Sequence, residues 1–80
     1  MPVLECEFEI GDGVGGTEEY IGNSDTPEDC GILVQTERPT ANGATWGNGQ
    51  CYAEFNMDGA NDSTDYQSCI FGGCCVFNAF

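Results

Sequence analysis

The chain has 80 residues, which is enough for one domain and too short for two. Its 14 acidic residues are opposed by a single basic residue, Arg38, and there is no histidine, so the net charge is −13. This charge repels phosphate backbones and anionic membranes, which excludes nucleic acid as a partner and favours cationic partners and divalent metal ions.

The first segment alternates between apolar and acidic residues. Between residues 3 and 10, the apolar side chains at every second position are Leu4, Cys6, Phe8 and Ile10. A repeat of two is typical of a strand with one apolar face, so we expect a strand over residues 3–10. The glycine-rich segment 11–16 predicts a flexible turn, and residues 17–21 predict a second short strand.

A helix is expected next. Thr26 can cap its first turn, and Pro27 loses no hydrogen bond at the first helical position. Three apolar residues then recur at helical spacing: Cys30, Leu33 and Val34. We therefore expect a helix from about Pro27 to about Glu37, which ends before Pro39.

The second half predicts strands joined by turns. The expected strands cover residues 44–46, 50–55 and 66–71. The first two flank Asn48-Gly49, a strong hairpin signal, and a polar loop over 56–65 precedes the third. One helix among short strands predicts an α+β fold in which the helix packs on a small antiparallel sheet.

Six cysteines in so short a chain predict a disulfide framework: Cys6, Cys30, Cys51, Cys69, Cys74 and Cys75. A zinc site is the alternative, but the chain has no histidine and no C-x2-C pair. Each bridge would contribute roughly 2–4 kcal/mol to a core that is small on its own. Disulfides require an oxidising compartment, so we expect a secreted, extracellular protein. No apolar stretch approaches the roughly 20 residues of a membrane span, so membrane insertion is not expected.

Catalysis is not expected. The chain lacks histidine and lysine, and no base stands beside a hydroxyl or thiol nucleophile. Pairs of carboxylates are inevitable among 14 acids, and an 80-residue chain has little room for a substrate cleft. We therefore predict that the protein is not an enzyme and requires no cofactor.

The polar loop over 56–65 contains candidate calcium ligands: Asp58, Asn61, Asp62 and Asp65. Calcium prefers carboxylate and carbonyl oxygens, which these residues supply, although the spacing does not fit an EF-hand. The alternative is a solvated turn in which Asp and Asn side chains cap nearby backbone groups.

Two aromatic residues are candidates for ligand binding. Trp46 and Tyr52, with Phe55, could form a surface on which a sugar ring stacks. The alternative, which we favour for Trp46, is that it belongs to the core of a domain with few large side chains.

The end of the chain carries the adjacent pair Cys74-Cys75 followed by apolar residues. Adjacent cysteines usually bond to two different partners, either within the chain or in a second chain. Residues 72–80 are therefore a candidate extra strand or association tail of the single domain 1–80, and a homodimer through this tail is one hypothesis.

Much of the chain resembles a PAN/apple module. The resemblance rests on T-P-E-D-C-G-I-L-V-Q at 26–35, A-N-G-A-T-W at 41–46, G-Q-C-Y-A-E-F at 49–55 and Y-Q-S-C-I-F at 66–71. It implies two bridges, Cys30–Cys51 and Cys6–Cys69, and an apple-like fold. Val34 stands where the family often has a second helix cysteine, and the pattern does not account for Cys74-Cys75.

Two functions are compatible with these features. Modules of this family resemble adhesion units, which implies a secreted, non-catalytic recognition module that binds an extracellular protein or glycan. The acidic excess and the cysteine-containing apolar tail favour a different function, an acidic structural or matrix protein that self-associates and responds to calcium.

Overall fold

The computed structural model describes residue 4 and residues 6–71. Its elements, in chain order, are β1 (Glu9–Ile10), β2 (Gly13–Val14), β3 (Thr17–Asn23), α1 (Pro27–Glu37), β4 (Gly43–Gly47), β5 (Gln50–Phe55), β6 (Gly59–Ala60) and β7 (Gln67–Ile70). Five strands form an antiparallel sheet in the order β1-β7-β4-β5-β3, and β2 pairs with β6 in a separate two-stranded sheet.

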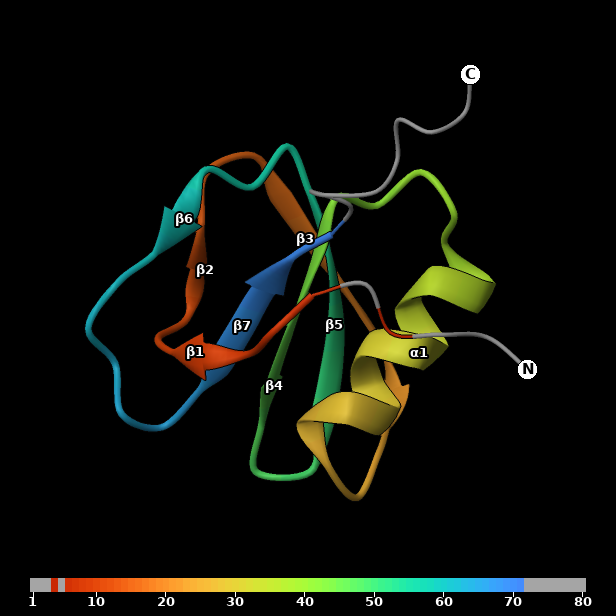
Figure 1. Ribbon diagram of the computed structural model, residues 1–80, viewed down its shortest axis with the longest axis horizontal. Coiled ribbons are helices and arrows are strands. Elements are labelled where there is room, and N and C mark those ends of the chain that lie inside the picture. The colour runs from red at the N-terminus through yellow and green to blue at the C-terminus, as the bar shows by residue number, and fades with distance from the viewer. Residues whose placement is uncertain (1–3, 5, 72–80) are drawn as a thin grey trace.

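The helix covers one face of the five-stranded sheet. α1 packs on β4 and β5 in the middle of that sheet, while β2 and β6 lie at the end of the molecule away from α1 (Figure 1). This arrangement confirms the predicted α+β fold, with one helix packed on a small antiparallel sheet. Among the described residues, no helix is long and apolar enough to cross a membrane.

Local sequence signals explain the helix. Thr26 adopts an extended conformation, and its side-chain oxygen accepts a hydrogen bond from the backbone N–H of Asp29 at 3.1 Å. Pro27 occupies the first helical position, and the helix ends at Glu37, as predicted. The backbone N–H of Arg38 donates to the carbonyl of Val34 at 2.8 Å and closes the last turn.

The hairpin between β4 and β5 is also a local feature. Asn48 has φ of 51° and Gly49 has φ of 79°, and these positive angles are typical of a two-residue hairpin turn. The turn aligns Gly47 with Gln50, which sets the register of the two central strands. The predicted hairpin is confirmed.

The predicted strand over residues 3–10 was too long. Among the described residues of this segment, only Glu9 and Ile10 pair with a neighbour, β7, and Ile10 is 63% exposed. The alternation correctly placed Leu4, Cys6 and Phe8 toward the interior, where they are half-buried. Hydrophobic alternation reports which side chains face a core, whereas pairing also needs a free strand edge.

Two segments expected to be irregular contain short strands. β2 lies in the predicted turn 11–16, and β6 lies in the predicted loop 56–65. The two strands pair at Gly13↔Ala60 and Val14↔Gly59. Strands of two residues carry no detectable repeat, and their pairing joins distant parts of the chain, so sequence patterns could not predict them.

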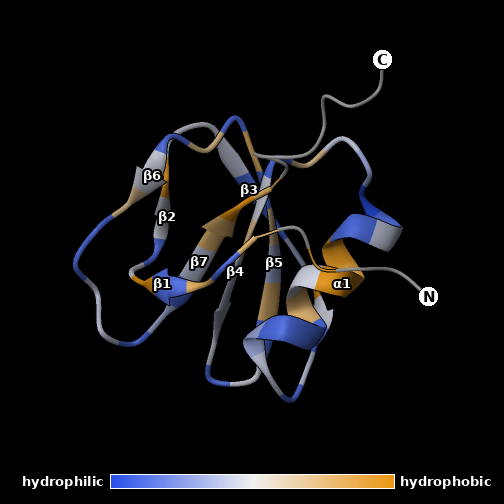
Figure 2. Ribbon diagram, in the orientation of Figure 1, coloured by the Kyte–Doolittle hydropathy of each residue, from blue (hydrophilic) through white to orange (hydrophobic). Residues whose placement is uncertain are grey.

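Small side chains form the core between helix and sheet. Its buried members are Cys30, Val34, Ala41, Ala44, Cys51, Ala53 and Cys69. The structure contains both bridges that the family resemblance implied, Cys30–Cys51 and Cys6–Cys69. Cys74 and Cys75, and the predicted tail 72–80, lie outside the described residues. Figure 2 shows hydrophobic residues in the middle of α1 and in β5, on which α1 packs.

The contribution of the helix cap to stability can be tested by mutation. Replacing Thr26 by alanine leaves the N–H of Asp29 without its side-chain acceptor. We expect Thr26→Ala to lower the free energy of unfolding by about 1 kcal/mol, measured by denaturant unfolding of the oxidised protein. Thr36→Ala, at an exposed position of the same helix, is the control and should not destabilise the protein. Equal losses in both variants would contradict the assigned cap.

Candidate functional site

The face of the sheet opposite α1 carries polar and aromatic side chains. In β5, Cys51 and Ala53 point toward the helix core, so the alternating residues Tyr52 and Glu54 point away from it. In β3, Tyr20 pairs with Tyr52 and Glu18 pairs with Glu54, which places both pairs on this opposite face. Their side chains line up across neighbouring strands.

The two-stranded sheet β2–β6, here called the flap, covers part of this face. The backbone N–H of Gly13 donates to Thr45 Oγ1 at 3.2 Å, and a Cβ at Gly13 would lie 2.8 Å from the same oxygen. The hydroxyl of Ser68 donates to the carbonyl of Gly11 at 2.9 Å, and Met57 is buried beside the flap. Through these contacts the flap packs against the sheet and covers Thr45 and Glu54, which are each 1% exposed.

The part of this face that the flap leaves open carries three tyrosines, Tyr20, Tyr52 and Tyr66, which we call the tyrosine face. The rings of Tyr20 and Tyr52 have centroids 5.6 Å apart and planes at 62°, an edge-to-face arrangement. The ring of Tyr66 lies on Gly47, where any Cβ would collide with it. Tyr20 is 52% exposed, and the other two rings are half-buried.

Two tyrosine hydroxyls bond within the same surface. The Tyr20 hydroxyl donates to Asn23 Oδ1 at 2.6 Å, and the Tyr52 hydroxyl donates to Gln50 Oε1 at 3.1 Å. These bonds hold the outer ends of both rings. The exposed ring surfaces remain available for contact with another molecule.

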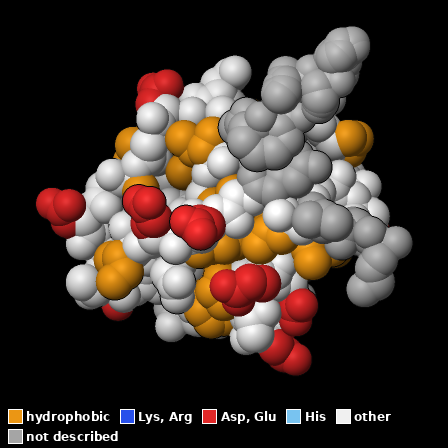
Figure 3. Space-filling model, in the orientation of Figure 1, with side chains coloured by type: hydrophobic (Ala, Val, Ile, Leu, Met, Phe, Trp, Pro, Cys, Tyr) orange, Lys and Arg blue, Asp and Glu red, His pale blue; other side chains and the backbone are white. Residues whose placement is uncertain are grey.

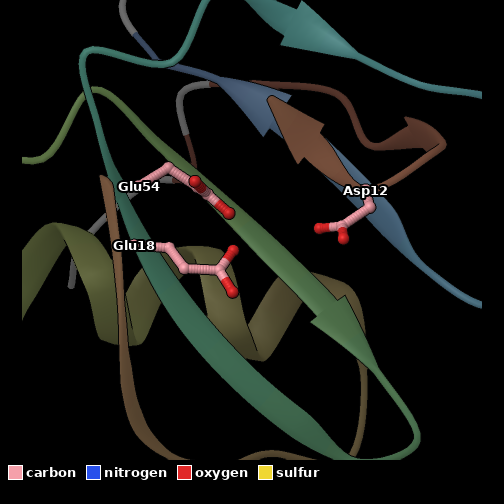
Figure 4. Close-up of side chains that lie close together, drawn as sticks. All are labelled: Asp12, Glu18 and Glu54. Carbon is pink, nitrogen blue, oxygen red and sulfur yellow. The ribbon is translucent and has the colours of Figure 1, made fainter. Parts of the chain in front are cut away.

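Three carboxyl groups converge beside the tyrosine face. One oxygen from each of Asp12, Glu18 and Glu54 lies within 4.8 Å of the other two, and we call this set the carboxyl cluster. Figure 4 shows the three side chains directed toward one another on the side of the sheet away from α1. Glu18 and Glu54 come from the paired strands β3 and β5, and Asp12 comes from the turn before β2.

A hydroxyl group and a proton stabilise the close approach of the three carboxyl groups in the carboxyl cluster. The Thr45 hydroxyl donates to Glu54 Oε2 at 2.6 Å in the buried interior. Burial raises the pKa of Glu54 to about 8, and a hydrogen bond with Glu18 acts in the same direction. Burial and the charge of Glu18 also raise the pKa of Asp12. At neutral pH, Glu54 therefore carries a proton that reduces repulsion within the carboxyl cluster.

Carboxylate oxygens are the ligands that calcium prefers, so the chemistry of the carboxyl cluster suits a hard cation. Glu54, however, already accepts from Thr45 and holds a proton at neutral pH. A cation that used all three carboxyl groups would have to displace this proton. Cation binding there would therefore strengthen as the pH rises.

The loop predicted to hold calcium is arranged differently. Among the described residues, Asp58, Asp62 and Asp65 do not form a convergent group of carboxylates. Asn61 Oδ1 instead accepts from the backbone N–H of Asp12 at 2.9 Å and of Ser63 at 2.8 Å. This geometry matches the alternative of a turn capped by its own polar side chains, and calcium binding stays a prediction.

The two aromatic candidates lie on opposite faces of the sheet, so the predicted joint surface of Trp46, Tyr52 and Phe55 is wrong. Trp46 and Phe55 pack against the core beneath the helix, as we favoured for Trp46. The indole N–H of Trp46 donates to the carbonyl of Ser24 at 3.0 Å. Only Tyr52 lies on the opposite face and remains a candidate for ligand contact.

Sequence reasoning missed most of the residues beside Tyr52. Glu18 and Tyr20 alternate within residues 17–21, which was a detectable sign that both belong to one face. Asp12 and Tyr66 join them only through the long-range contacts of the flap and β7. Local sequence patterns do not predict such long-range contacts.

Acidic side chains also occupy the opposite side of the molecule. On the face drawn in Figure 3 they lie in several separate places with apolar side chains between them. In its described part, no lysine or arginine side chain is visible. The dispersed acids contrast with the convergence of the carboxyl cluster.

Comparisons with protein-family models, with curated proteins and with solved structures gave no significant match. The resemblance to the PAN/apple family therefore stays a prediction.

The buried glutamic acid predicts a pH dependence of stability. In the folded protein Glu54 keeps its proton up to about pH 8, whereas the ordinary value for the unfolded chain is 4.5. Between these values the folded state binds more protons than the unfolded state, so this group makes the free energy of unfolding fall as the pH rises. For one proton the slope is at most about 1.4 kcal/mol per pH unit.

Glu54→Gln tests this dependence because the amide keeps the shape and the acceptor for Thr45 but cannot ionise. We expect the variant to gain stability relative to the wild type steadily from pH 5 to pH 8 in denaturant unfolding. Glu37→Gln removes one charge at an exposed helix end and is the control. Parallel curves for the wild type and Glu54→Gln would show that Glu54 is ionised in both states.

Proposed function

We propose that this protein is a secreted, non-catalytic recognition module of apple-like type that binds a protein or a carbohydrate through the tyrosine face. The observation that carries the proposal is the edge-to-face pair of Tyr20 and Tyr52 on an open part of the sheet. Tyrosine is enriched where proteins bind other molecules, because its ring offers apolar area and its hydroxyl a polar contact.

The distribution of large side chains supports this proposal. The fully buried part of the helix–sheet core consists of cysteine, alanine and valine, and larger side chains such as Trp46 and Phe55 pack around it. The tyrosines lie outside that core, and Tyr20 is 52% exposed although the domain is small. An exposed aromatic ring contributes no burial energy to folding. A bound ligand that covers the ring would gain this energy.

The covalent framework supports the extracellular part of the proposal. Two disulfides join α1 to β5 and the N-terminal segment to β7. Such bonds persist in oxidising compartments and are rare in the cytosol. The resemblance of residues 26–71 to the PAN/apple family points to the same setting.

A binding screen with residue-level detection tests the proposal. Two-dimensional NMR of the oxidised protein would be recorded with neutral oligosaccharides and with extracellular proteins. A ligand of the tyrosine face should cause saturable shifts at Tyr20 and Tyr52. We expect Tyr20→Ala to weaken that binding about fivefold, because an aromatic contact contributes on the order of 1 kcal/mol.

Thr36→Ala is the matched control because Thr36 is exposed on the helix side of the molecule. It should bind as the wild type does. A ligand whose affinity drops equally in both variants, or whose shifts avoid the tyrosines, would place the binding surface elsewhere.

The second candidate function is an acidic matrix protein that self-associates and responds to calcium. The net charge of −13 and the convergent carboxyl cluster favour it. In that case, calcium titration with magnesium as the control should give saturable shifts either at residues 56–65 or at the carboxyl cluster. Small shifts over the whole acidic surface that do not saturate would remove calcium as a cofactor.

The association hypothesis has a separate test. If Cys74 or Cys75 links two chains, a non-reducing gel should show a dimer that reducing agent converts to monomer. Monomer alone at every protein concentration would contradict the covalent homodimer.

A further inference from the structure

We propose that the tyrosine face recognises an arginine side chain on a basic segment of a partner protein, with Glu18 and Asp12 as its counter-charges. This inference rests on the proposed function and names the ligand class. It follows from the charge of the surface, the arrangement of the rings and the kind of hydrogen bonds that the surface can make.

Among the described residues, no cationic side chain lies on this surface. The single basic residue of the chain is Arg38, at the end of α1 on the opposite side of the sheet. Arg38 Nε and Nη2 donate to the two carboxylate oxygens of Glu19, each at 2.9 Å. The described side chains therefore leave the negative charge beside the tyrosine face without a cationic counterpart, and charge complementarity favours a cationic partner.

The rings and the carboxyl groups form one continuous surface. Glu18 is two residues from Tyr20 on the same face of β3, and its partner across the strands is next to Tyr52 on the same face of β5. Burial raises the pKa of the Tyr52 hydroxyl, and four neighbours raise it further through their charges: Tyr66, Glu18, Tyr20 and Asp12. Because Glu18 and Tyr20 are two residues apart on one face of β3, a cation on the Tyr20 ring would lie beside the Glu18 carboxylate.

The open ring surfaces suit a flat cation. Tyr20 packs edge-to-face against Tyr52 and is still 52% exposed, so part of its ring is open to solvent, and aromatic faces attract cations. An arginine guanidinium is planar, stacks on such rings and donates two parallel hydrogen bonds to a carboxylate. A lysine ammonium group carries the charge but has no planar group that can stack on the rings. A neutral sugar has neither the charge nor the planar group.

The hydrogen-bonding groups favour a donor. The hydroxyls of Tyr20 and Tyr52 already donate to side chains of this chain. Glu18, when ionised, only accepts hydrogen bonds. A guanidinium, which only donates, is the complement of such a surface.

Three capped peptides of the same length test the proposal. One carries two arginines among glycine and serine, the second carries lysines, and the third carries citrulline, which has the shape of arginine without its charge. Binding to the oxidised protein would be followed by NMR of the tyrosine rings. We expect saturable shifts of Tyr20, Tyr52 and Tyr66 with the arginine peptide, and binding of the citrulline peptide at least about tenfold weaker.

Matched variants separate this site from general attraction to an acidic protein. Glu18→Gln and Glu37→Gln remove the same charge, but Glu37 lies at the far end of α1. Glu18→Gln should weaken arginine-peptide binding several-fold more than Glu37→Gln does. Unchanged backbone spectra away from the substitution would show that each variant remains folded.

Each outcome decides the proposal. Equal affinity for the three peptides, equal effects of the two glutamine variants, or shifts spread over the whole surface would overturn it. Saturable shifts of the tyrosines with a neutral oligosaccharide but not with the arginine peptide would overturn it and leave the proposed function standing. If neither an oligosaccharide, an extracellular protein nor an arginine peptide shifts the tyrosines, both are wrong.

Discussion

The Cys30–Cys51 bond, buried between helix and sheet, is the constraint on which the structure depends. It joins α1 to β5, and both cysteines are fully buried. The helix can approach the sheet closely because the surrounding residues are small, notably Val34, Ala44 and Ala53. A core this small gives little stability on its own, so the covalent link to the central strand contributes a large share.

The position of the site follows from that bond. Because Cys51 points toward the helix, its neighbour Tyr52 in β5 must point to the opposite face. Antiparallel pairing with β3 then brings Tyr20 beside Tyr52 and aligns Glu18 across from the next residue on that face. The flap covers the end of this face that contains the carboxyl cluster, and it leaves the tyrosines open. The inward position of Cys51 and the register of β3 therefore determine which side chains lie on the opposite face.

Sequence patterns predicted the parts of the fold that depend on neighbouring residues. The cap at Thr26, the turn at Asn48 and the strands beside it all have local causes, and all were confirmed. The pairing of β2 with β6 and the short extent of β1 depend on contacts with distant segments, so they were missed. Within the site, Tyr52 was identified, but its grouping with Trp46 was wrong because the two strands had not yet been aligned. Aromatic residues close in sequence say nothing about a shared face until the register is known.

The buried carboxyl group connects the stability of the fold with the charge of its surface. Glu54 holds a proton because the flap and the sheet exclude water from it, and this proton reduces the repulsion among the three carboxyl groups. A cation placed beside Glu18 would favour the ionised form of Glu54, so that the proton and the cation compete for the same cluster. The flap packs closely above Glu54, where a Cβ added at Gly13 would lie 3.0 Å from its carboxyl group. The carboxyl cluster lies beside the exposed tyrosines, and this proximity is the reason for proposing that an external cation binds here rather than elsewhere on the acidic surface.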